Sequence, residues 1–345
     1  MAGTREIQSR MKSIQDTMKI TNAMYMISST KLRKAKKELE ETEPYFYTLQ
    51  SMIARIMRHI PEMEHRYFER KPQIRLSSGE GGEAVSDTAK EQVIGAGTNG
   101  SAGNSVKGKT SPEQSGKKTA YHGYLVVTAD KGLAGAYNHN VLKLAEEQLA
   151  VSGNGKLFVV GEVGRQYFAG KKIPVEEHFL YTAQNPTMSR ARIIAAKLLE
   201  LYDSGELGSV DMIYTSMKNG MQTETNLVRL LPLPRGDFHV PKLPMDVRRE
   251  QFRFRPSPEA VIESVVPNYL AGYIYGGLVE AYCSEHNARM IAMEAANDSA
   301  GEMLRQLSVE YNRVRQGVIT QEITEVISGA KAQKRKQKAA KYQVI

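Results

Sequence analysis

The feature that most constrains this chain is a long C-terminal stretch without proline. No proline follows Pro267 in a chain of 345 residues, and the sequence from about Asn268 to Gly329 has the periodicity of one helix. At about 1.5 Å per residue, such a helix would be roughly 90 Å long. Small residues recur along it at steps of four, three and four, which predicts close approach of a partner backbone: Ala288, Ala292, Ala295 and Ser299.

The N-terminal sixty residues supply a partner for this helix. Apolar or small residues alternate at steps of four and three, the seam of a coiled coil, at Ile7, Met11, Ile14, Met18, Thr21, Tyr25, Ser28, Leu32, Ala35 and Leu39. We expect a kink at Pro44, with the helix continuing to Ile60. A second apolar set beside the seam predicts contact with something other than the partner helix: Ile20, Ala23, Met24 and Ile27.

Together these segments predict a long antiparallel coiled coil built from residues 1–60 and 268–330. Because the N-terminal helix is the shorter of the two, the far end of its partner is left uncovered. Four aliphatic residues there need shelter from another protein, as a hydrophobic bearing would provide: Ile319, Ile323, Val326 and Ile327.

Between the two helices the chain changes character twice. Residues 77–119 are rich in Gly and Ser and contain no aromatic residue. Such a segment cannot bury enough surface to offset its ordering entropy, so we expect a disordered insertion. Residues 121–233 alternate strand-like and helix-like segments, which is typical of a small sheet with crossover helices. The predicted fold class is therefore α/β: a long coiled coil plus a Rossmann-like α/β domain.

Composition excludes several classes of protein. Hydrophobic residues make up 41% and charged residues 25%, and no apolar run approaches the length of a membrane span. The first ten residues, MAGTREIQSR, lack the apolar core of a signal peptide, so we expect no membrane insertion and no export. The single cysteine, Cys283, excludes an intramolecular disulfide and a multi-cysteine zinc site.

The formal charge of +9 is concentrated at one end. Six basic residues and no acidic residue lie in the tail, residues 331–345, so the body is close to balanced. This argues against a nucleic-acid partner, which would favour a basic face on the folded body. A second basic cluster on the first helix fits either a solvated flank or a docking face for an acidic partner: Lys31, Arg33, Lys34, Lys36 and Lys37.

Signatures of catalysis are lacking. DKGLAGAYN, residues 130–138, carries Gly132 and Gly135 where a phosphate loop would lie, but has neither G-x-G-x-x-G nor a closing Gly-Lys-Ser/Thr. A tight strand-to-helix turn is the simpler interpretation. GEVGRQ, residues 161–166, is weaker still, and the seven histidines form no H-E-x-x-H pair. We therefore predict no catalytic residues, no cofactor and no metal site.

Three long strings resemble the gamma subunit of F-type ATP synthases. They are REIQSRMKSIQDTMKITNAMYMISSTKLRKA at the start, GYLVVTADKGLAGAYN in the middle, and ARMIAMEAANDSAGEMLRQLSVEYNRVRQGVITQEITEVISGA near the end. The resemblance covers nearly everything except residues 77–119 and the basic tail. Unlike the thiol-switch insert of chloroplast members, the insertion lacks cysteine. The family usually ends near Ser328 to Ala330, so the role of the tail is open.

The resemblance implies a central stalk, or rotor shaft, of the proton-translocating F-type ATP synthase, a non-catalytic subunit that couples ion flow to ATP synthesis by rotation. Implied partners are the hexamer of alpha and beta subunits, the epsilon subunit and the ring of c subunits. In a bacterium this location is the cytoplasmic face of the plasma membrane, peripherally bound. Whether H⁺ or Na⁺ is the coupling ion depends on the c subunits.

The resemblance also implies contacts with the beta subunit. Arg315 and Gln316 match the pair that bonds a polar loop of beta. Met24 and the basic cluster, with Lys31, Arg33 and Lys34, match the region that faces an acidic segment of beta. Two alternatives remain: a basic coiled-coil protein that binds or tethers nucleic acid, and an enzyme with a degenerate Rossmann site.

Overall fold

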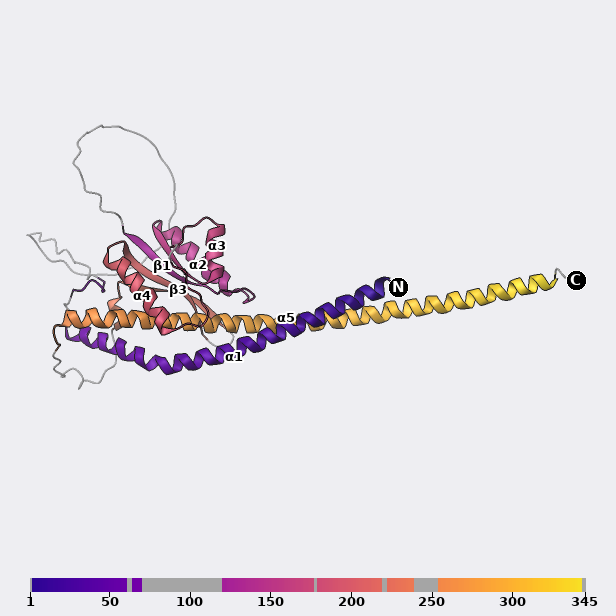
Figure 1. Ribbon diagram of the computed structural model, residues 1–345, viewed down its shortest axis with the longest axis horizontal. Helices are drawn as coiled ribbons and strands as arrows, with labels where there is room; N and C mark the ends of the chain where they lie inside the picture. The colour runs from indigo at the N-terminus through magenta and orange to yellow at the C-terminus, as the bar shows by residue number, and fades with distance from the viewer. Residues whose placement is uncertain are drawn as a thin grey trace, which may run out of the picture. The chain divides into compact units, whose positions relative to one another are not determined.

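The computed structural model describes residues 2–60, 64–69, 120–176, 179–218, 222–238 and 254–342, and for Ala2, His59, Asp237 and 336–342 only the backbone. The segment 77–119 lies outside the described residues. The elements, labelled in Figure 1, are α1 (Ala2–His59), β1 (Tyr121–Val127), α2 (Tyr137–Ser152), β2 (Gly155–Val160), α3 (Glu162–Gly170), α4 (Met188–Asp203), β3 (Leu207–Met217), β4 (Thr223–Leu231), the short 3₁₀ helix η1 (Arg235–Phe238) and α5 (Pro258–Tyr342).

The two terminal helices, α1 and α5, lie side by side and run in opposite directions (Figure 1). The predicted seam of α1 is confirmed, because all ten of its residues are buried or half-buried. The pattern continues through Leu49, Ile53 and Ile56, which are buried. Pro44 does not end the helix, and α1 is assigned as helical from Ala2 to His59 with that proline inside it.

Helix α5 is longer at both ends than the predicted span of 268–330. It begins at Pro258 and contains Pro267. A proline inside a helix removes one hydrogen bond and crowds the preceding turn. The helix persists because Ile262, Val266 and Leu270 are all buried around this point, so that tertiary packing overrides the local cost. At the other end the basic residues continue the helix to Tyr342. Lys, Arg, Gln and Ala are good helix formers.

The small-residue seam predicted for α5 is wrong. Ala295 and Ser299 are exposed, and Ala288 packs against the cluster formed by Ala129, Ala134 and Tyr137 of the α/β part. The stripe that is buried or half-buried has the same alternating spacing but a different phase: Met293, Asn297, Ala300, Leu304, Leu307, Tyr311, Val314 and Val318. The sequence does not distinguish these stripes, because two neighbouring faces of α5 both follow a four-three pattern and only one of them meets α1.

The sheet has four strands in the order β2-β1-β3-β4. β1 pairs in parallel with β2 and with β3, and β4 pairs with β3 in antiparallel orientation. The predicted Rossmann-like crossovers are thus confirmed for three strands, and the fourth is a hairpin edge. One face of the sheet packs into the main core together with α4 and α5, through Leu125, Val127, Phe158, Val160 and Met212. The other face, with Tyr124, Val126, Leu157, Val159 and Ile213, packs under α2 and α3, and α3 contributes Phe168.

Candidate functional site

A buried polar cluster fastens α5 to the α/β part of the molecule. The guanidinium of Arg289, on α5, donates from Nη2 to the carbonyl oxygens of Lys131 and Gly132, each at 3.1 Å. The same nitrogen donates to Oε1 of Glu285, one turn earlier, at 2.6 Å. Arg289 is 6% exposed and Glu285 is 5% exposed. One side chain therefore joins two parts of the chain through directional hydrogen bonds that are largely shielded from solvent.

The electrostatics of this cluster follow from burial. Desolvation raises the pKa of Glu285, against the opposing charge of Arg289. Desolvation, together with the cations Arg289 and Lys31, lowers the pKa of His286 to about 4. Among the residues that the structure describes, none is a hydrogen-bond partner of Nε2 of His286, and the Nδ1 of this ring lies 3.3 Å from Nη1 of Arg289. His286 is accordingly a neutral ring in the folded protein at pH 7.

This cluster was not predicted from the sequence. A signal was present in the string SEHNARM, where Glu285 and Arg289 are four residues apart and so share a helix face. Such pairs usually lie on solvated surfaces. Nothing in the local pattern shows that the β1–α2 loop would cover this one.

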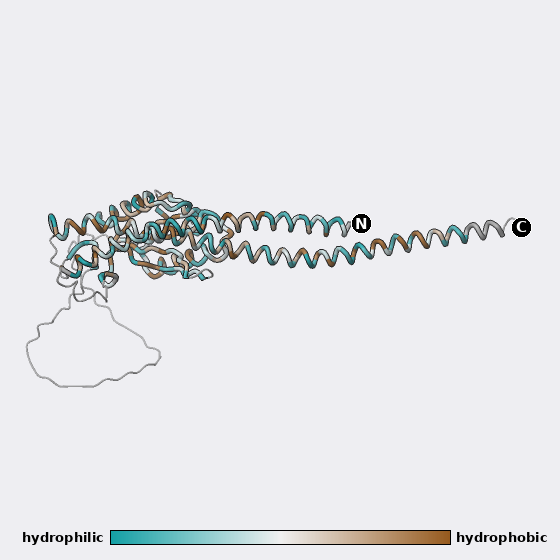
Figure 2. The backbone as a smooth tube through the Cα atoms, turned by 90° about the horizontal axis from the view of Figure 1, so that it is seen from below, coloured by the Kyte–Doolittle hydropathy of each residue, from teal (hydrophilic) through white to brown (hydrophobic). Residues whose placement is uncertain are grey.

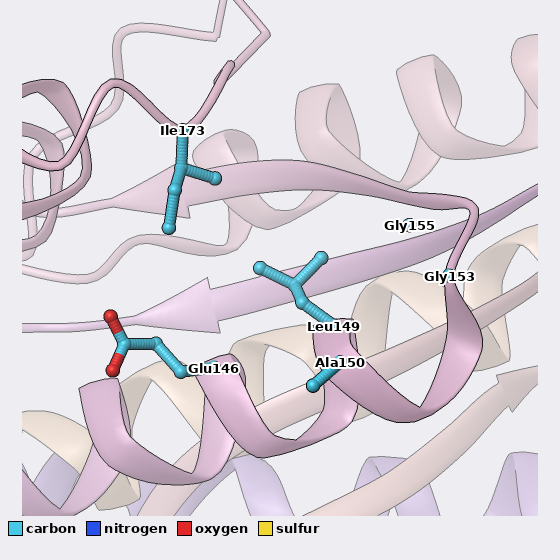
Figure 3. A pocket seen from close by; sticks show the side chains of 6 residues that line it. All are labelled: Glu146, Leu149, Ala150, Gly153, Gly155 and Ile173. Atoms are coloured by element: carbon cyan, nitrogen blue, oxygen red, sulfur yellow. The ribbon is translucent and has the colours of Figure 1, made fainter.

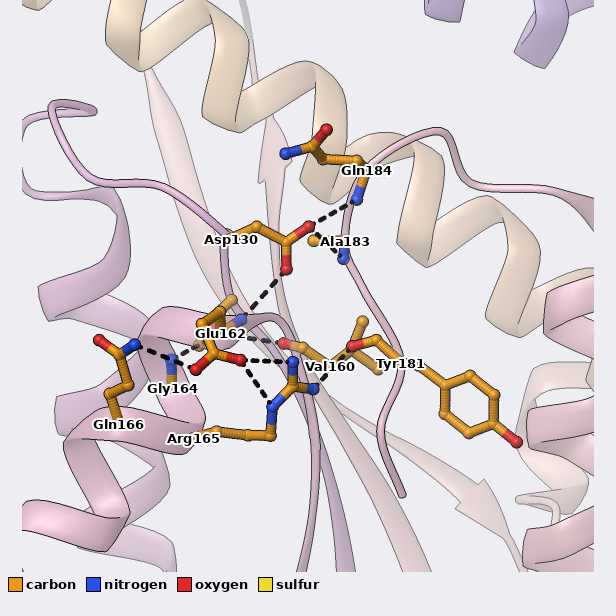
Figure 4. A network of polar contacts seen from close by, with 10 residues as sticks. Asp130, Val160, Glu162, Gly164, Arg165, Gln166, Tyr181, Ala183 and Gln184 are labelled. Atoms are coloured by element: carbon orange, nitrogen blue, oxygen red, sulfur yellow. Dashed lines mark hydrogen bonds and ion pairs between the residues drawn. The ribbon is translucent and has the colours of Figure 1, made fainter. Parts of the chain in front are cut away.

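The loop that follows β1 is held by Asp130 rather than shaped around a phosphate (Figure 4). One carboxylate oxygen of Asp130 accepts from the amide of Glu162 at 3.1 Å. The other accepts from the amides of Ala183 and Gln184, at 3.0 and 3.1 Å. Three backbone donors from two separate segments thus converge on one carboxylate. The residues around Gly132 form a structural junction, which agrees with the turn expected from the sequence.

The glycines of GEVGRQ have a packing role. Gly161 has a φ of +99°, and a Cβ built there would lie 2.3 Å from the carbonyl oxygen of Thr128. At Gly164 a Cβ would lie 2.6 Å from Oγ1 of Thr128, which accepts a hydrogen bond from the Gly164 amide at 3.0 Å. Helix α3 therefore approaches β1 at backbone distance. Arg165 adds bonds to Glu162 and to the carbonyl of Tyr181 (Figure 4).

Met24 and its neighbours form a flank of α1 beside the helical seam. Met24 is half-buried, whereas Ile20, Met26 and Ile27 are between 56% and 62% exposed. A run of exposed aliphatic side chains on one helix is unusual for a solvated surface. At the same level of the pair, the hydroxyl of Thr21 donates to the side chain of Asn297 and so sets the register of the two helices.

The basic residues of α1 divide into two groups. Lys31 is half-buried and lies near the Glu285–Arg289 cluster, as its electrostatic influence on both Glu285 and His286 indicates. Arg33 and Lys34 are exposed. Lys34 makes a long contact of 3.8 Å with Glu38. Both remain accessible to an acidic partner, although exposed pairs of this kind contribute little to folding.

The end of α5 runs beyond α1 (Figure 1). Val318 is the last half-buried residue, and every residue from 319 to 335 is exposed. Aliphatic residues recur along this projecting end (Figure 2), at Ile319, Ile323, Val326 and Ile327. Arg315 and Gln316 are exposed just before it. They lie 18 and 19 positions beyond Asn297, the partner of Thr21, which is about 27 Å or more along the helix. The structure therefore does not bring them near Met24.

A cavity of about 390 Å³ opens between the end of α2 and the segment that follows α3 (Figure 3). It is lined by Glu146, Leu149, Ala150, Gly153, Gly155 and Ile173. Of these, only Glu146 is charged, and it is already paired with Lys171. Within the described residues, no group of three or more His, Cys, Asp or Glu side chains could hold a metal ion. No helix among them is long and apolar enough to cross a membrane.

Known proteins resemble this chain over nearly its whole length. A family model described as ATP synthase matches residues 3–333. The ATP synthase gamma chain of Caldanaerobacter subterraneus subsp. tengcongensis is 38% identical, over 95% of this chain and 99% of the relative. That of Ruminiclostridium cellulolyticum is also 38% identical, over 95% and 98%. A sodium ion specific gamma chain from Acetobacterium woodii is 30% identical, over 95% and 98%.

Solved structures agree at the level of the fold. A chain in the mitochondrial ATP synthase of Euglena gracilis, in the assembly of OSCP, F1 and c-ring, superposes with a TM-score of 0.57. It is 13% identical, and the match covers 96% of this chain and 94% of that chain. These relatives are all ATP synthase chains, so they do not support the alternative of a nucleic-acid-binding coiled coil. With the family model matched from residue 3 to 333 and gamma chains matched almost end to end, this chain belongs to the ATP synthase gamma chain family.

Proposed function

We propose that this chain is the rotating central stalk of an ATP synthase, which couples ion flow through the membrane sector to ATP synthesis at the beta subunits. The observation that carries the proposal is the projecting end of α5. Ile319, Ile323 and Val326, at steps of four and three, place aliphatic side chains on one face of a helix with no covering element in the described part of the chain. Exposed apolar surface costs about 25 cal/mol per Å² relative to burial, so this end favours an apolar sleeve.

The sleeve is the hexamer of alpha and beta subunits. In this arrangement Arg315 and Gln316 bond a polar loop of beta just below the bearing. Met24, Lys31, Arg33 and Lys34 face an acidic segment of beta further along the shaft, from about 30 Å away at Met24 to about 45 Å at Lys34. The separation of these two surfaces lets a rotating shaft contact beta at more than one level along its axis. Rotation then changes nucleotide affinity through contacts that differ between states.

The α/β part takes the opposite end of the stalk, where the epsilon subunit and the c-subunit ring bind. Support comes from its fastening to the shaft: Arg289 and Asp130 join the β1–α2 loop to α5 and to the segment around Gln184. Force applied to the sheet is thereby passed to the helical pair. The subunit is peripheral to the membrane and, in a bacterium, lies on the cytoplasmic face of the plasma membrane.

Single-molecule rotation tests this function. Cys283 is the only cysteine and is buried, so Arg192→Cys, at an exposed position of α4, supplies one accessible thiol for a probe. Reconstituted with alpha and beta subunits, the labelled chain should turn in one direction in steps when ATP is added. The unsubstituted chain, carrying no probe, controls for labelling elsewhere. Complexes that hydrolyse ATP while the probe stays still would refute the proposal.

A further inference from the structure

A second cavity, of about 220 Å³, lies where α1, α5 and β3 meet. Its floor is a run of glycines on α5. A Cβ at Gly272 would lie 2.1 Å from the ring of Phe46, and one at Gly277 would lie 2.5 Å from the methyl of Met212. At Gly276, by contrast, a Cβ would meet nothing within 4 Å. The two outer glycines are filled by neighbours, and the middle one opens into the cavity.

The walls of this cavity are aromatic and acidic. Five aromatic side chains line it, together with two carboxylates, and none of the lining residues is Lys, Arg or His: Phe46, Tyr47, Tyr214, Tyr269, Tyr273, Glu43 and Glu280. Glu43 accepts a hydrogen bond from the hydroxyl of Tyr47 at 3.0 Å. In the part of the chain that the structure describes, neither carboxylate makes an ion pair.

Among the described residues, Glu280 has fewer stabilising contacts than Glu43, the other carboxylate of the cavity. It is half-buried, and burial, reinforced by Glu43, raises the pKa of its carboxyl. A partly desolvated carboxylate beside a second carboxylate is stabilised by any cation that can enter. Aromatic faces add a cation–π attraction, which grows as water is excluded.

We propose that this cavity binds a cationic group with a short apolar stem, a guanidinium or alkylammonium. Glu280 and Glu43 supply the counter-charge, and the tyrosine rings contact the stem and the planar head. The cavity is smaller than the roughly 300 Å³ at which sites for drug-sized ligands begin, which suits one basic head group rather than a nucleotide. Such a group comes either from a basic side chain of a neighbouring protein or from a free amine.

Calorimetry on the full-length chain tests the site with blocked arginine, N-acetyl-arginine methylamide. The matched probe is the citrulline equivalent, which has nearly the same shape and no charge. We expect the arginine probe to bind at least tenfold more tightly than the citrulline probe. Glu280→Gln should weaken binding of arginine at least tenfold, whereas Glu302→Gln, on the exposed surface of the same helix, should not.

Blocking the cavity gives an independent measurement. Gly276→Leu places a side chain into the open space and should abolish binding, while Gly317→Leu, at an exposed glycine of α5 that also has nothing within 4 Å, should leave it intact. Unchanged thermal unfolding of both variants shows that the helix is preserved. Absence of arginine binding, equal binding of citrulline, or indifference to Glu280→Gln would each overturn the proposal.

Binding of the probe to the assembled enzyme distinguishes a partner's basic side chain from a free amine as the ligand. Only this experiment rests on the proposed function. If a partner's basic side chain fills the cavity, the complex no longer takes up the arginine probe, and Glu280→Gln weakens retention of the chain in the complex. If a free amine is the ligand, the complex binds the probe as the free chain does. A chain that binds the probe but does not rotate would refute the proposed function and leave this site standing.

Discussion

Arg289 and Gly132 are 157 positions apart in the sequence, yet a guanidinium nitrogen of one lies 3.1 Å from the carbonyl oxygen of the other. Apolar contacts alone tolerate small slides between packed elements, whereas charged hydrogen bonds are directional. The contact therefore resists relative motion of α5 and the β1–α2 loop. In a shaft that transmits torque, such a contact opposes twisting between α5 and this loop.

Removing the guanidinium should be costly. Arg289→Ala leaves the buried carboxylate of Glu285 without its cation and two carbonyl oxygens without a donor. We expect the free energy of unfolding to fall by about 3 to 5 kcal/mol, measured by urea denaturation of the full-length chain. Arg305→Ala is the matched control, because its pair with Glu302 is exposed, and it should cost less than about 1 kcal/mol. Similar losses in both variants would contradict a buried clamp.

Acid should weaken the folded chain through His286. Its folded pKa of about 4 lies below the ordinary value of 6.5, so the unfolded state binds more protons between these limits and stability falls as pH is lowered through them. At pH 5 the loss from this group is about 2 kcal/mol.

His286→Gln removes the titrating ring but can still accept a hydrogen bond. Its unfolding free energy should therefore change less between pH 7.5 and pH 5 than that of the unsubstituted chain. Burial raises the pKa of Glu285, which acts in the opposite direction but is present in both proteins. Equal acid sensitivity of the two proteins would show that protonation of His286 does not cause the loss of stability.

The contact between α3 and β1 depends on a missing side chain. Gly161→Ala would place a Cβ against the carbonyl oxygen of Thr128 and hold it at positive φ. We expect a loss of at least about 2 kcal/mol in unfolding free energy. Gly170→Ala is the control, since a Cβ there meets open space. It should be neutral or stabilising by up to about 1 kcal/mol. Chemical denaturation of both variants measures these changes in unfolding free energy. Equal changes would argue against the close approach of Gly161 to Thr128.

Met24→Lys probes the flank of α1. Met24 is half-buried beside exposed aliphatic neighbours, so a lysine there reaches solvent or a partner carboxylate without breaking the seam. A partly desolvated pair with an acidic segment of beta contributes about 1 to 3 kcal/mol and would hold one rotary state too tightly. The variant should assemble and hydrolyse ATP but pump ions poorly.

Subunit stoichiometry and ATP-driven pumping are measured together to test this, with Met24→Leu as the uncharged control. Poor assembly would indicate instead that Met24 serves only the helical pair. Normal pumping per ATP in a fully assembled Met24→Lys enzyme would rule out the proposed contact.

Local pattern was sufficient for the seam of α1. The apolar or small residues from Ile7 to Leu39 recur at steps that keep one face of the helix apolar. Such a face is buried away from water whatever element covers it. The strands before Ala129 and before Gly161 were equally readable, because their runs of buried aliphatic residues are characteristic of a parallel sheet. These features depend on the nearest neighbours along the chain.

The phase of α5 was not readable from the sequence. Ala292, Ala295 and Ser299 fit the same spacing as Met293, Asn297 and Ala300, and the choice between two adjacent faces depends on where the α/β part covers the helix. The continuation of α5 through Pro267 is a second case, since a proline inside a helix is locally unfavourable and only the surrounding core outweighs it.

The sequence by itself determined the family, the helical pair, the alternating sheet and the uncovered aliphatic end of α5. Tertiary structure alone decided the contacts of Arg289 with Gly132, the three amides on Asp130, and the acidic aromatic cavity over Gly276. Periodicity records which face of an element avoids water. It carries no information about which distant carbonyl or carboxylate will meet that face, because such pairs form only when separate elements pack together.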